Sequence, residues 1–247
     1  MPYNNVMKKL LIIGDPKGTH SLSALSKYAP EDITVWENDS RHIYTIKQIC
    51  DRINVTTDLQ ELVDKGMKFD VVIGNPPYGK NSNLAVKFLN KAAELSKDIH
   101  MVLPRTFRKP SIINRLNPHL HLVSDSDVDD SAFRDSIVAC VQKWEVKEEQ
   151  RERIVTYTKH KDFTFCKKSE ADICLGRVGG GPTGKVFDEW ENRSENSHYF
   201  LKVSSPEVID NLRTLYKEFK CAALQTVGCP SLSKDDCVKI YSENFGQ

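Results

Sequence analysis

The sequence predicts an α/β protein built on a mostly parallel sheet, and two observations support this prediction. The first is an alternation of patterns from residue 9 to residue 144. Short apolar or β-branched runs, which favour strands, alternate with stretches whose apolar residues recur every three or four positions, as in amphipathic helices. Such alternation indicates a parallel sheet with helices on both faces. The second is the composition, which is 39% hydrophobic and 28% charged and therefore typical of globular proteins.

Seven runs are candidate strands, and three stretches between them are candidate helices. The expected strands are residues 9–14, 33–37, 53–57, 69–74, 99–104, 120–124 and 136–144. The expected helices are residues 21–29, 43–52 and 83–97. The last two strands are joined by polar residues with no helical stretch. We therefore expect them to form an antiparallel hairpin at the edge of the sheet.

Charge and cysteine content limit the classes of function. The formal net charge of +1 gives no support for a general polyanion binder, although folding can still create a local basic face. The seven cysteines form no C-x-x-C pair, so we expect reduced thiols and no metal site. No segment approaches the roughly 18 apolar residues that a membrane span needs. These features predict a soluble, cytoplasmic protein with no membrane partner.

Residues 75–78 read Asn-Pro-Pro-Tyr and directly follow the fourth expected strand. Ligands of open α/β sheets gather beyond the carboxyl ends of strands, so the segment stands where a site is expected. Pro76 and Pro77 lack a backbone N–H and make a rigid turn. The Asn75 side chain and a neighbouring carbonyl can accept both hydrogen bonds of an exocyclic amine. Tyr78 offers a flat ring on which a base can stack, worth about 1–3 kcal/mol.

This segment, after a hydrophobic strand, resembles the catalytic motif of S-adenosylmethionine-dependent adenine-N6 methyltransferases, which act mainly on DNA. The resemblance extends over residues 8–146 and implies a Rossmann-like, seven-stranded methyltransferase sheet. It implies that the target adenine is flipped out of the stack. Asn75 and the Pro76 carbonyl would hold its amine, Tyr78 would stack on the base, and the methyl group would pass in line to N6. Bacterial and phage enzymes of this type serve in DNA methylation and restriction-modification.

The same resemblance implies a Gly-rich cofactor loop after the first strand. Residues 12–20 read IIGDPKGTH, in which Gly18 takes the position of the first family glycine. Gly14 stands where an acidic residue is expected, with Asp15 beside it, and His20 replaces the second glycine. The resemblance implies that Asp15 and Gly18 contact S-adenosylmethionine, in a pose that these departures leave open.

Acidic residues after the second and third strands complete the expected cofactor site. Glu37 ends the second strand and resembles the family residue that binds the ribose hydroxyls. Asp58 follows the third strand. It is expected either to accept a hydrogen bond from the adenine of the cofactor or to cap the helix that follows.

Two further segments resemble family elements near the target base. Residues 101–107 resemble the fifth strand and its turn, which implies that Arg105 and Phe107 lie at the rim of the pocket. Residues 131–144 resemble a segment whose phenylalanine, here Phe133, packs near the target base. The alternative for Phe133 is an ordinary core position.

The residues after the sheet are expected to form a smaller α+β region that recognises the target. We place the boundary between a catalytic domain, 1–148, and this region, 149–247. Residues 179–185 satisfy G-x-x-x-x-G-K, but Val186 stands where a nucleotide-binding loop needs Ser or Thr. We instead expect Arg177 and Lys185 to contact phosphates. The alternative is a Gly-rich hairpin loop beside a buried strand.

The sequence thus predicts an adenine-specific DNA methyltransferase. One alternative keeps the chemistry and changes the substrate to RNA. Another is a non-catalytic methyltransferase-fold protein that binds nucleic acid or a partner enzyme. The sequence predicts neither the recognition sequence, nor the oligomeric state, nor a cognate restriction nuclease.

Overall fold

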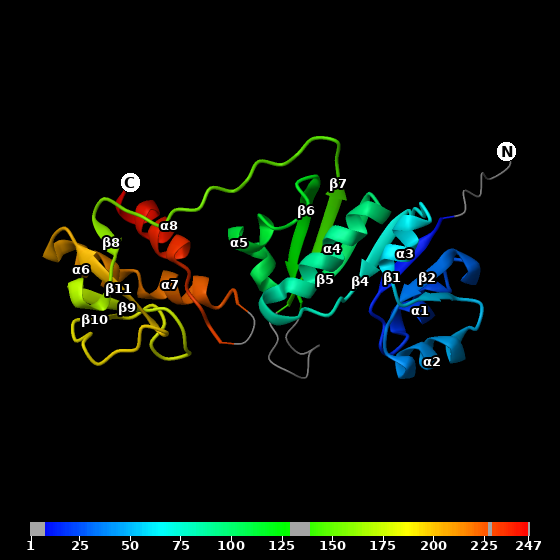
Figure 1. Ribbon diagram of the computed structural model, residues 1–247, viewed down its shortest axis with the longest axis horizontal. Helices are drawn as coiled ribbons and strands as arrows, with labels where there is room; N and C mark the ends of the chain where they lie inside the picture. Colours follow the sequence, from blue (N-terminus) through cyan, green and yellow to red (C-terminus); the bar gives the residue numbers. More distant parts are fainter. Residues whose placement is uncertain (1–7, 129–138, 227–228, 247) are drawn as a thin grey trace. The chain divides into compact units, whose positions relative to one another are not determined.

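The computed structural model describes residues 8–128, 139–226 and 229–246, which divide into two compact units (Figure 1). Unit 1 comprises the described residues 8–107, 112–128 and 139–153. Unit 2 comprises the described residues 108–111, 154–226 and 229–246. Each unit has its own sheet and its own hydrophobic core.

Unit 1 is built on a seven-stranded sheet in the order β3-β2-β1-β4-β5-β7-β6. Its strands are β1 (Leu10–Ile13), β2 (Ile33–Trp36), β3 (Asn54–Thr56), β4 (Val71–Gly74), β5 (Asp98–Pro104), β6 (Leu120–Asp127) and β7 (Ala139–Val146). The strands from β3 to β5 pair in parallel, whereas β7 pairs antiparallel with both β5 and β6. The predicted α/β sheet with an antiparallel hairpin is therefore confirmed. The hairpin places β6 at the edge and β7 next to β5.

Helices cover both faces of this sheet. Successive residues of each strand face opposite sides, so the apolar strands present side chains to both faces. The helices of unit 1 are α1 (Thr19–Ala24), α2 (Ser40–Ile49), α3 (Leu59–Asp64) and α4 (Asn83–Leu95). Leu10 and Ile12 of β1 pack in one cluster with residues of α1 and α2. Leu11 and Ile13 pack in the larger cluster with α3 and α4. The two faces of β1 thus hold two separate cores.

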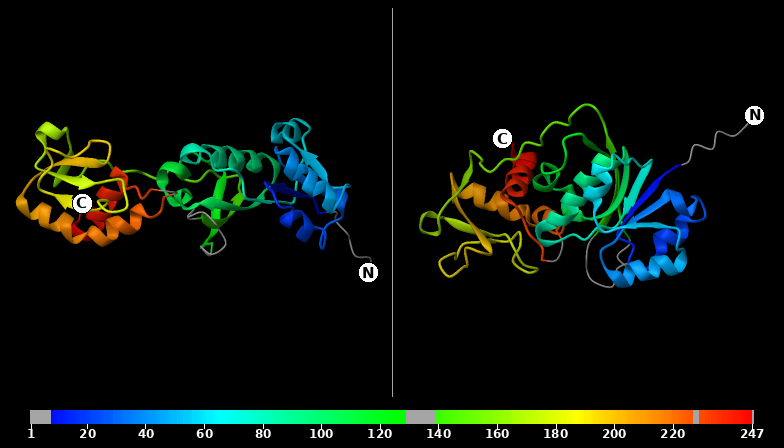
Figure 2. Two further views of the ribbon diagram at one scale, coloured as in Figure 1. Left: turned by 90° about the horizontal axis from the view of Figure 1, so that it is seen from below. Right: turned by 45° about the vertical axis from the view of Figure 1, so that its right-hand side comes forward.

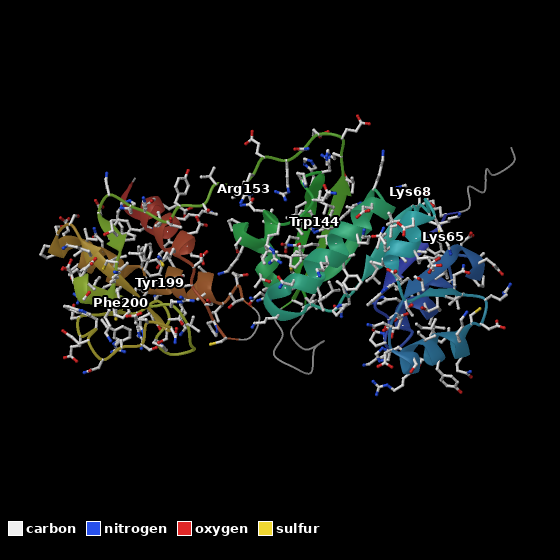
Figure 3. All side chains as sticks on the ribbon, in the orientation of Figure 1. Lys65, Lys68, Trp144, Arg153, Tyr199 and Phe200 are labelled. Carbon is white, nitrogen blue, oxygen red and sulfur yellow. The ribbon has the colours of Figure 1, made fainter. Side chains whose placement is uncertain are left out.

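Helix α4 shows why the predicted spacing forms a helix. Its buried residues recur at three- and four-residue intervals and form a continuous apolar face; they are Ala85, Val86, Leu89, Ala92 and Leu95. This face packs into the larger core, which also contains the buried Trp144 of β7 (labelled in Figure 3). The Trp144 Nε1–H donates to the Gln142 side chain at 3.1 Å, so its polar atom is satisfied within the core.

Short helical turns precede or follow several strands of the seven-stranded sheet. They are the 3-10 helices η1 (Pro30–Asp32), η2 (Lys80–Ser82) and η3 (Arg105–Arg108) and the helix α5 (Pro110–Ile113). Turns η2 and η3 follow β4 and β5, so they lie beside the carboxyl ends of the parallel strands.

Unit 2 contains a four-stranded antiparallel sheet in the order β10-β9-β11-β8. Its strands are β8 (Phe163–Phe165), β9 (Ile173–Gly176), β10 (Val186–Phe187) and β11 (His198–Val203). Its helical elements are η5 (Lys168–Glu170), α6 (Pro206–Thr214), α7 (Tyr216–Ala223) and α8 (Lys234–Phe245). Helices α6, α7 and α8 cover one face of the sheet (Figure 2), with Phe219 and Tyr241 fully buried between the layers. This is the smaller α+β region that the sequence predicts.

Among the described residues, none of the helices has the length and apolar character needed to cross a bilayer.

Candidate active site

The ends of β1 and β4 approach so closely that both require glycine. A Cβ atom on Gly14 would lie 2.6 Å from the carbonyl oxygen of Asn75, and one on Gly74 would lie 2.2 Å from the carbonyl oxygen of Ile13. Gly14 also has a φ of 74°, in the left-handed region that favours glycine. The Asn75 N–H donates to the Ile13 carbonyl at 2.9 Å. The backbone therefore fixes Asn75 against the loop that follows β1.

The Asn-Pro-Pro-Tyr segment is held at its other end by helix α4. The Tyr78 carbonyl accepts hydrogen bonds from the N–H groups of Leu84 and Ala85, at 3.1 and 3.3 Å. Within the segment, Pro76 is buried, Pro77 is exposed and Asn75 is half-buried. Asn75 is thus both anchored by its backbone and partly accessible.

The turn between this segment and α4 contains two residues in the left-handed region. Asn81 has a φ of 53° and Ser82 a φ of 58°, values that are uncommon for residues other than glycine. The Ser82 hydroxyl lies 2.9 Å from the Thr106 hydroxyl of η3. The turns after β4 and β5 are therefore linked by a side-chain hydrogen bond.

Tyr78 is half-buried and packs against the larger core of unit 1. Its hydroxyl is buried and has no hydrogen-bond partner among the described residues. Burial and, to a smaller extent, the nearby Cys140 thiol raise the pKa of Tyr78 to about 12. The phenol is accordingly neutral at physiological pH.

A pocket of about 280 Å³ lies at the carboxyl ends of β1, β2 and β4. It is lined by Gly14, Pro16, Trp36, Glu37, Asn38, Asp39, His42, Asn75 and Pro77. Asn75 and Glu37, which the sequence assigns to different tasks, therefore line the same cavity.

Glu37 is buried and its two carboxylate oxygens have different partners. Oε1 accepts hydrogen bonds from the N–H groups of Asn38 and Asp39, at 2.9 and 3.2 Å. Oε2 lies 3.4 Å from Nδ1 of His42, which lines the same pocket. The sequence reasoning missed His42. The sequence contained a signal for it, namely Asp39 as a candidate N-cap. Asp39 caps α2, so His42 falls in the first turn of that helix, close to the end of β2.

Asp15 and Gly18 both have structural partners within the chain. The buried Asp15 carboxylate accepts hydrogen bonds from the Ser21 hydroxyl, the Ser21 N–H and the His20 N–H, at 2.6, 2.8 and 3.1 Å. A Cβ on Gly18 would lie 2.1 Å from Cδ1 of Ile49. The absence of a side chain at Gly18 thus makes room for helix α2, and Asp15 organises the start of α1.

A second pocket of about 310 Å³ lies beside the first and shares Trp36 with it. It is lined by Trp36, Thr57, Asp58, Leu59, Gln60, Leu84, Lys87, Phe88 and Lys91. Asp58 is the N-cap of α3, and its Oδ1 accepts the Gln60 N–H at 2.8 Å. Asp58 therefore has the capping role that the sequence left open, and it also lines this pocket.

Arg105 and Phe107, which are expected at the rim of the pocket, lie in different environments. Arg105 begins η3, and its Nε lies 3.0 Å from a carboxylate oxygen of Asp127 on β6. Phe107 has no exposed surface and belongs to the larger core of unit 1, so it does not face a pocket. The reason is that η3 turns its side chain inward, into the core that also contains Ile112 of α5. Phe133 lies outside the described residues.

The two expected phosphate contacts in unit 2 lie in separate environments. Arg177 follows β9 and lines a groove with Tyr199, a β11 residue labelled in Figure 3. The Lys185 Nζ instead lies 5.9 Å from the ring centroid of Tyr216, at the start of α7. The seven cysteines are unpaired, and no group of acidic, His or Cys side chains within the described ranges has the arrangement of a metal site.

Residues 16–116 match the model of the Eco57I restriction-modification methylase family. The matched range contains Glu37, Asp58 and the whole Asn-Pro-Pro-Tyr segment. It confirms the resemblance to S-adenosylmethionine-dependent methyltransferases. No curated protein sequence matches the chain.

Several solved structures of methyltransferases are similar to part of the chain. TrmN from Thermus thermophilus is 19% identical, with a TM-score of 0.46, over 57% of this chain and 44% of that chain. A ribosomal protein L11 methylase from Lactobacillus delbrueckii subsp. bulgaricus is 10% identical, with a TM-score of 0.45, over 59% and 73% of the two chains. A dimethyladenosine transferase from Plasmodium falciparum is 22% identical, with a TM-score of 0.41, over 58% of each chain. The chain spans less than half the length of TrmN.

Proposed function

We propose that this protein transfers a methyl group from S-adenosylmethionine to the N6 amine of adenine in DNA. The observation that carries the proposal is the position of Asn75. It follows β4, is fixed by its N–H bond to Ile13, and lines the same pocket as the buried Glu37. The match of residues 16–116 with a methylase family supports the reaction type.

The residues around the two pockets fit the proposed cofactor. Glu37 Oε2 accepts no backbone hydrogen bond from the residues that the structure describes, so we assign it as the acceptor for the ribose hydroxyls. Asp58 uses Oδ1 for capping, and its other oxygen is the acceptor for the adenine amine. Trp36 lines both pockets, and an adenosine would extend along it from one pocket to the other. We assign Asp15 and Gly18 to shaping the loop on which the methionine part rests.

Asn75 and its neighbours supply the chemistry at the acceptor. S-adenosylmethionine, when bound, supplies an electrophilic methyl group. The Asn75 side-chain oxygen and the Pro76 carbonyl accept the two N–H bonds of the adenine amine, which directs the nitrogen lone pair at that methyl group. The rigid Pro76-Pro77 turn fixes both acceptors before the substrate arrives, which lowers the barrier by positioning. The amine gains the methyl group as the bond between that methyl group and the sulfonium breaks, with S-adenosylhomocysteine as the leaving group. The methylated amine then releases a proton to solvent, so a strong general base is not required.

The remaining assignments follow from the reaction. The target adenine is flipped out of the duplex, and Tyr78 provides the ring on which it stacks. We assign the catalytic domain to residues 1–148 and target recognition to residues 149–247, with Arg105, Arg177 and Lys185 contacting the nucleic acid. We place the enzyme in the cytoplasm.

The test is transfer of labelled methyl from S-adenosylmethionine to duplex DNA and, in parallel, to total RNA. Each product is digested to nucleosides to identify the modified base. We expect N6-methyladenine from DNA. Label in RNA alone would change the substrate and keep the chemistry. Label in neither, together with no thermal stabilisation by S-adenosylhomocysteine, would overturn the proposal, because a ligand of the folded state raises its unfolding midpoint.

A further inference from the structure

Unit 2 contains a groove that the catalytic chemistry does not use. Its volume is about 980 Å³, and it lies beside β8, the loop after β9, β11 and the start of α8. Aromatic and cationic side chains line it, among them Phe165, Lys168, Arg177, Trp190, Tyr199 and Lys234. This combination of residues is typical of surfaces that bind nucleic acid.

Two cations of the groove are held on the ring of Tyr199. The Arg177 guanidinium carbon lies 5.1 Å from the centroid of that ring, and the Lys234 Nζ lies 5.9 Å from it. The Lys234 Nζ also lies 4.7 Å from the ring centroid of Phe165. Tyr199 itself is fixed, because its hydroxyl donates to the Leu232 carbonyl at 3.1 Å. The two charges are therefore ordered before any ligand binds.

Neither cation has a carboxylate partner within the described part of the chain. Other cations of unit 2 do form such pairs: Lys109 with Asp236 at 3.0 Å, and Arg213 with Asp188 at 2.6 Å. The Nε of Arg177 is buried and has no hydrogen-bond partner among the described residues. Two ordered positive charges with no carboxylate partner among the described residues favour an external anion.

The groove as a whole carries a positive balance. Four cationic side chains line it, those of Lys167, Lys168, Arg177 and Lys234, against the two carboxylates of Glu191 and Glu195. His198 also lines the groove, but burial lowers its pKa, so its ring is neutral at physiological pH. The positive charge therefore comes from the lysines and the arginine.

We infer that this groove binds the phosphodiester backbone of the nucleic-acid substrate, with Arg177 and Lys234 contacting phosphate oxygens on either side of Tyr199. The inference rests on the proposed function, because it identifies where the substrate strand is held. An arginine and a lysine that contact aromatic rings suit phosphates. Both side chains remain positively charged there and can still donate hydrogen bonds to phosphate oxygens. Tyr199 acts as a positioning residue for the two cations.

The test compares binding of labelled duplex DNA by the full-length protein and three variants over a range of salt concentrations. The variants are Arg177→Ala, Lys234→Ala and the double variant. Neutralising a phosphate contact lowers the slope of log affinity against log salt by about 1. We expect a decrease of about 1 for each single variant and about 2 for the double variant. Arg213→Ala and Lys239→Ala are matched controls, because these cations pair with carboxylates and do not line the groove.

Thermal stabilisation by S-adenosylhomocysteine separates failure of the groove from failure of the proposed function. It is expected to be the same in the wild type and the three variants. If wild-type protein binds and methylates DNA, and the double variant keeps its salt slope, the groove inference is wrong and the proposed function stands. If wild-type protein binds neither DNA nor RNA, both are wrong. Equal losses in the double variant and the two controls would also overturn the inference, since the effect would then reflect net charge.

Discussion

The carbonyl oxygen of Asn75 occupies the space that a side chain on Gly14 would need, 2.6 Å from the position of its Cβ. The Asn-Pro-Pro-Tyr segment after β4, called the acceptor segment after its proposed role, and the loop after β1 are therefore in direct backbone contact. A change on one side of this contact is transmitted to the other, because backbone atoms have less freedom to move than the end of a side chain.

Gly14→Ala is expected to lower both stability and cofactor binding. The added methyl group would meet the Asn75 carbonyl, and alanine at a φ of 74° is itself strained by about 1–2 kcal/mol. Gly66→Ala is the matched control, because Gly66 has a φ of 65° with open space around its Cβ position. Urea unfolding would show a loss of about 1–2 kcal/mol for the control and a larger loss for Gly14→Ala. Equal losses would mean that the contact with Asn75 is unimportant.

Asn75→Ala is expected to reduce methyl transfer about 10²-fold or more while leaving cofactor binding nearly unchanged. The side chain would hold the acceptor amine, whereas the fixed position of the segment depends on the backbone N–H of Asn75, which alanine keeps. Transfer rates and the thermal shift with S-adenosylhomocysteine measure the two effects separately. Asn192→Ala, at an exposed position of unit 2, is the control. Full activity of Asn75→Ala would remove Asn75 from the reaction.

Glu37→Gln is expected to weaken cofactor binding without preventing folding. The amide keeps an acceptor oxygen for the Asn38 and Asp39 N–H groups but loses the negative charge, and a hydrogen bond to a charged group contributes about 1.5–3 kcal/mol. Calorimetric titration with S-adenosylhomocysteine would show a loss in this range. The exposed Glu61, paired with Lys65, gives the control variant Glu61→Gln. Unchanged affinity in Glu37→Gln would place the ribose elsewhere.

Tyr78→Phe is expected to remove part of the alkaline sensitivity of folding. The pKa of Tyr78 is about 12 in the folded protein and about 10 in the unfolded chain. The folded state therefore retains the proton more tightly, so stability is complete below pH 10 and falls as pH rises toward 12. The variant lacks this fall, whereas Tyr44→Phe, at an exposed site, keeps it. Urea midpoints between pH 9 and 11 test this, and parallel curves for wild type and Tyr78→Phe would contradict it.

The sequence predicted most of the fold because the strands of the sheet are local patterns. Each of the seven expected runs overlaps a strand, and the expected helix at residues 83–97 corresponds to α4. The order of β6 and β7 was not predicted, because strand neighbours depend on long-range pairing. The expectation that Gly18 contacts the cofactor did not include the close approach of Ile49, which also depends on long-range packing.

The candidate site was predictable where its residues follow strands and less so elsewhere. Glu37 and Asn75 each end a strand, and the parallel sheet brings such ends together. Phe107 also follows a strand, but the direction of its side chain depends on turn η3, which has no clear sequence signal. The groove pairs Arg177 with Lys234, which are distant in sequence and meet only through the antiparallel sheet and α8.

The left-handed conformations of Asn81 and Ser82 mean that stability and the proposed catalysis would place opposite demands on this short turn. Each non-glycine residue in this region costs about 1–2 kcal/mol, which a chain selected for thermostability alone would recover by using glycine. Glycine would also restore conformational freedom between the acceptor segment and α4. A protein engineer who sought a heat-resistant form should therefore begin at positions remote from this turn. Relief of its strain would allow Asn75 to leave the orientation that the proposed reaction requires.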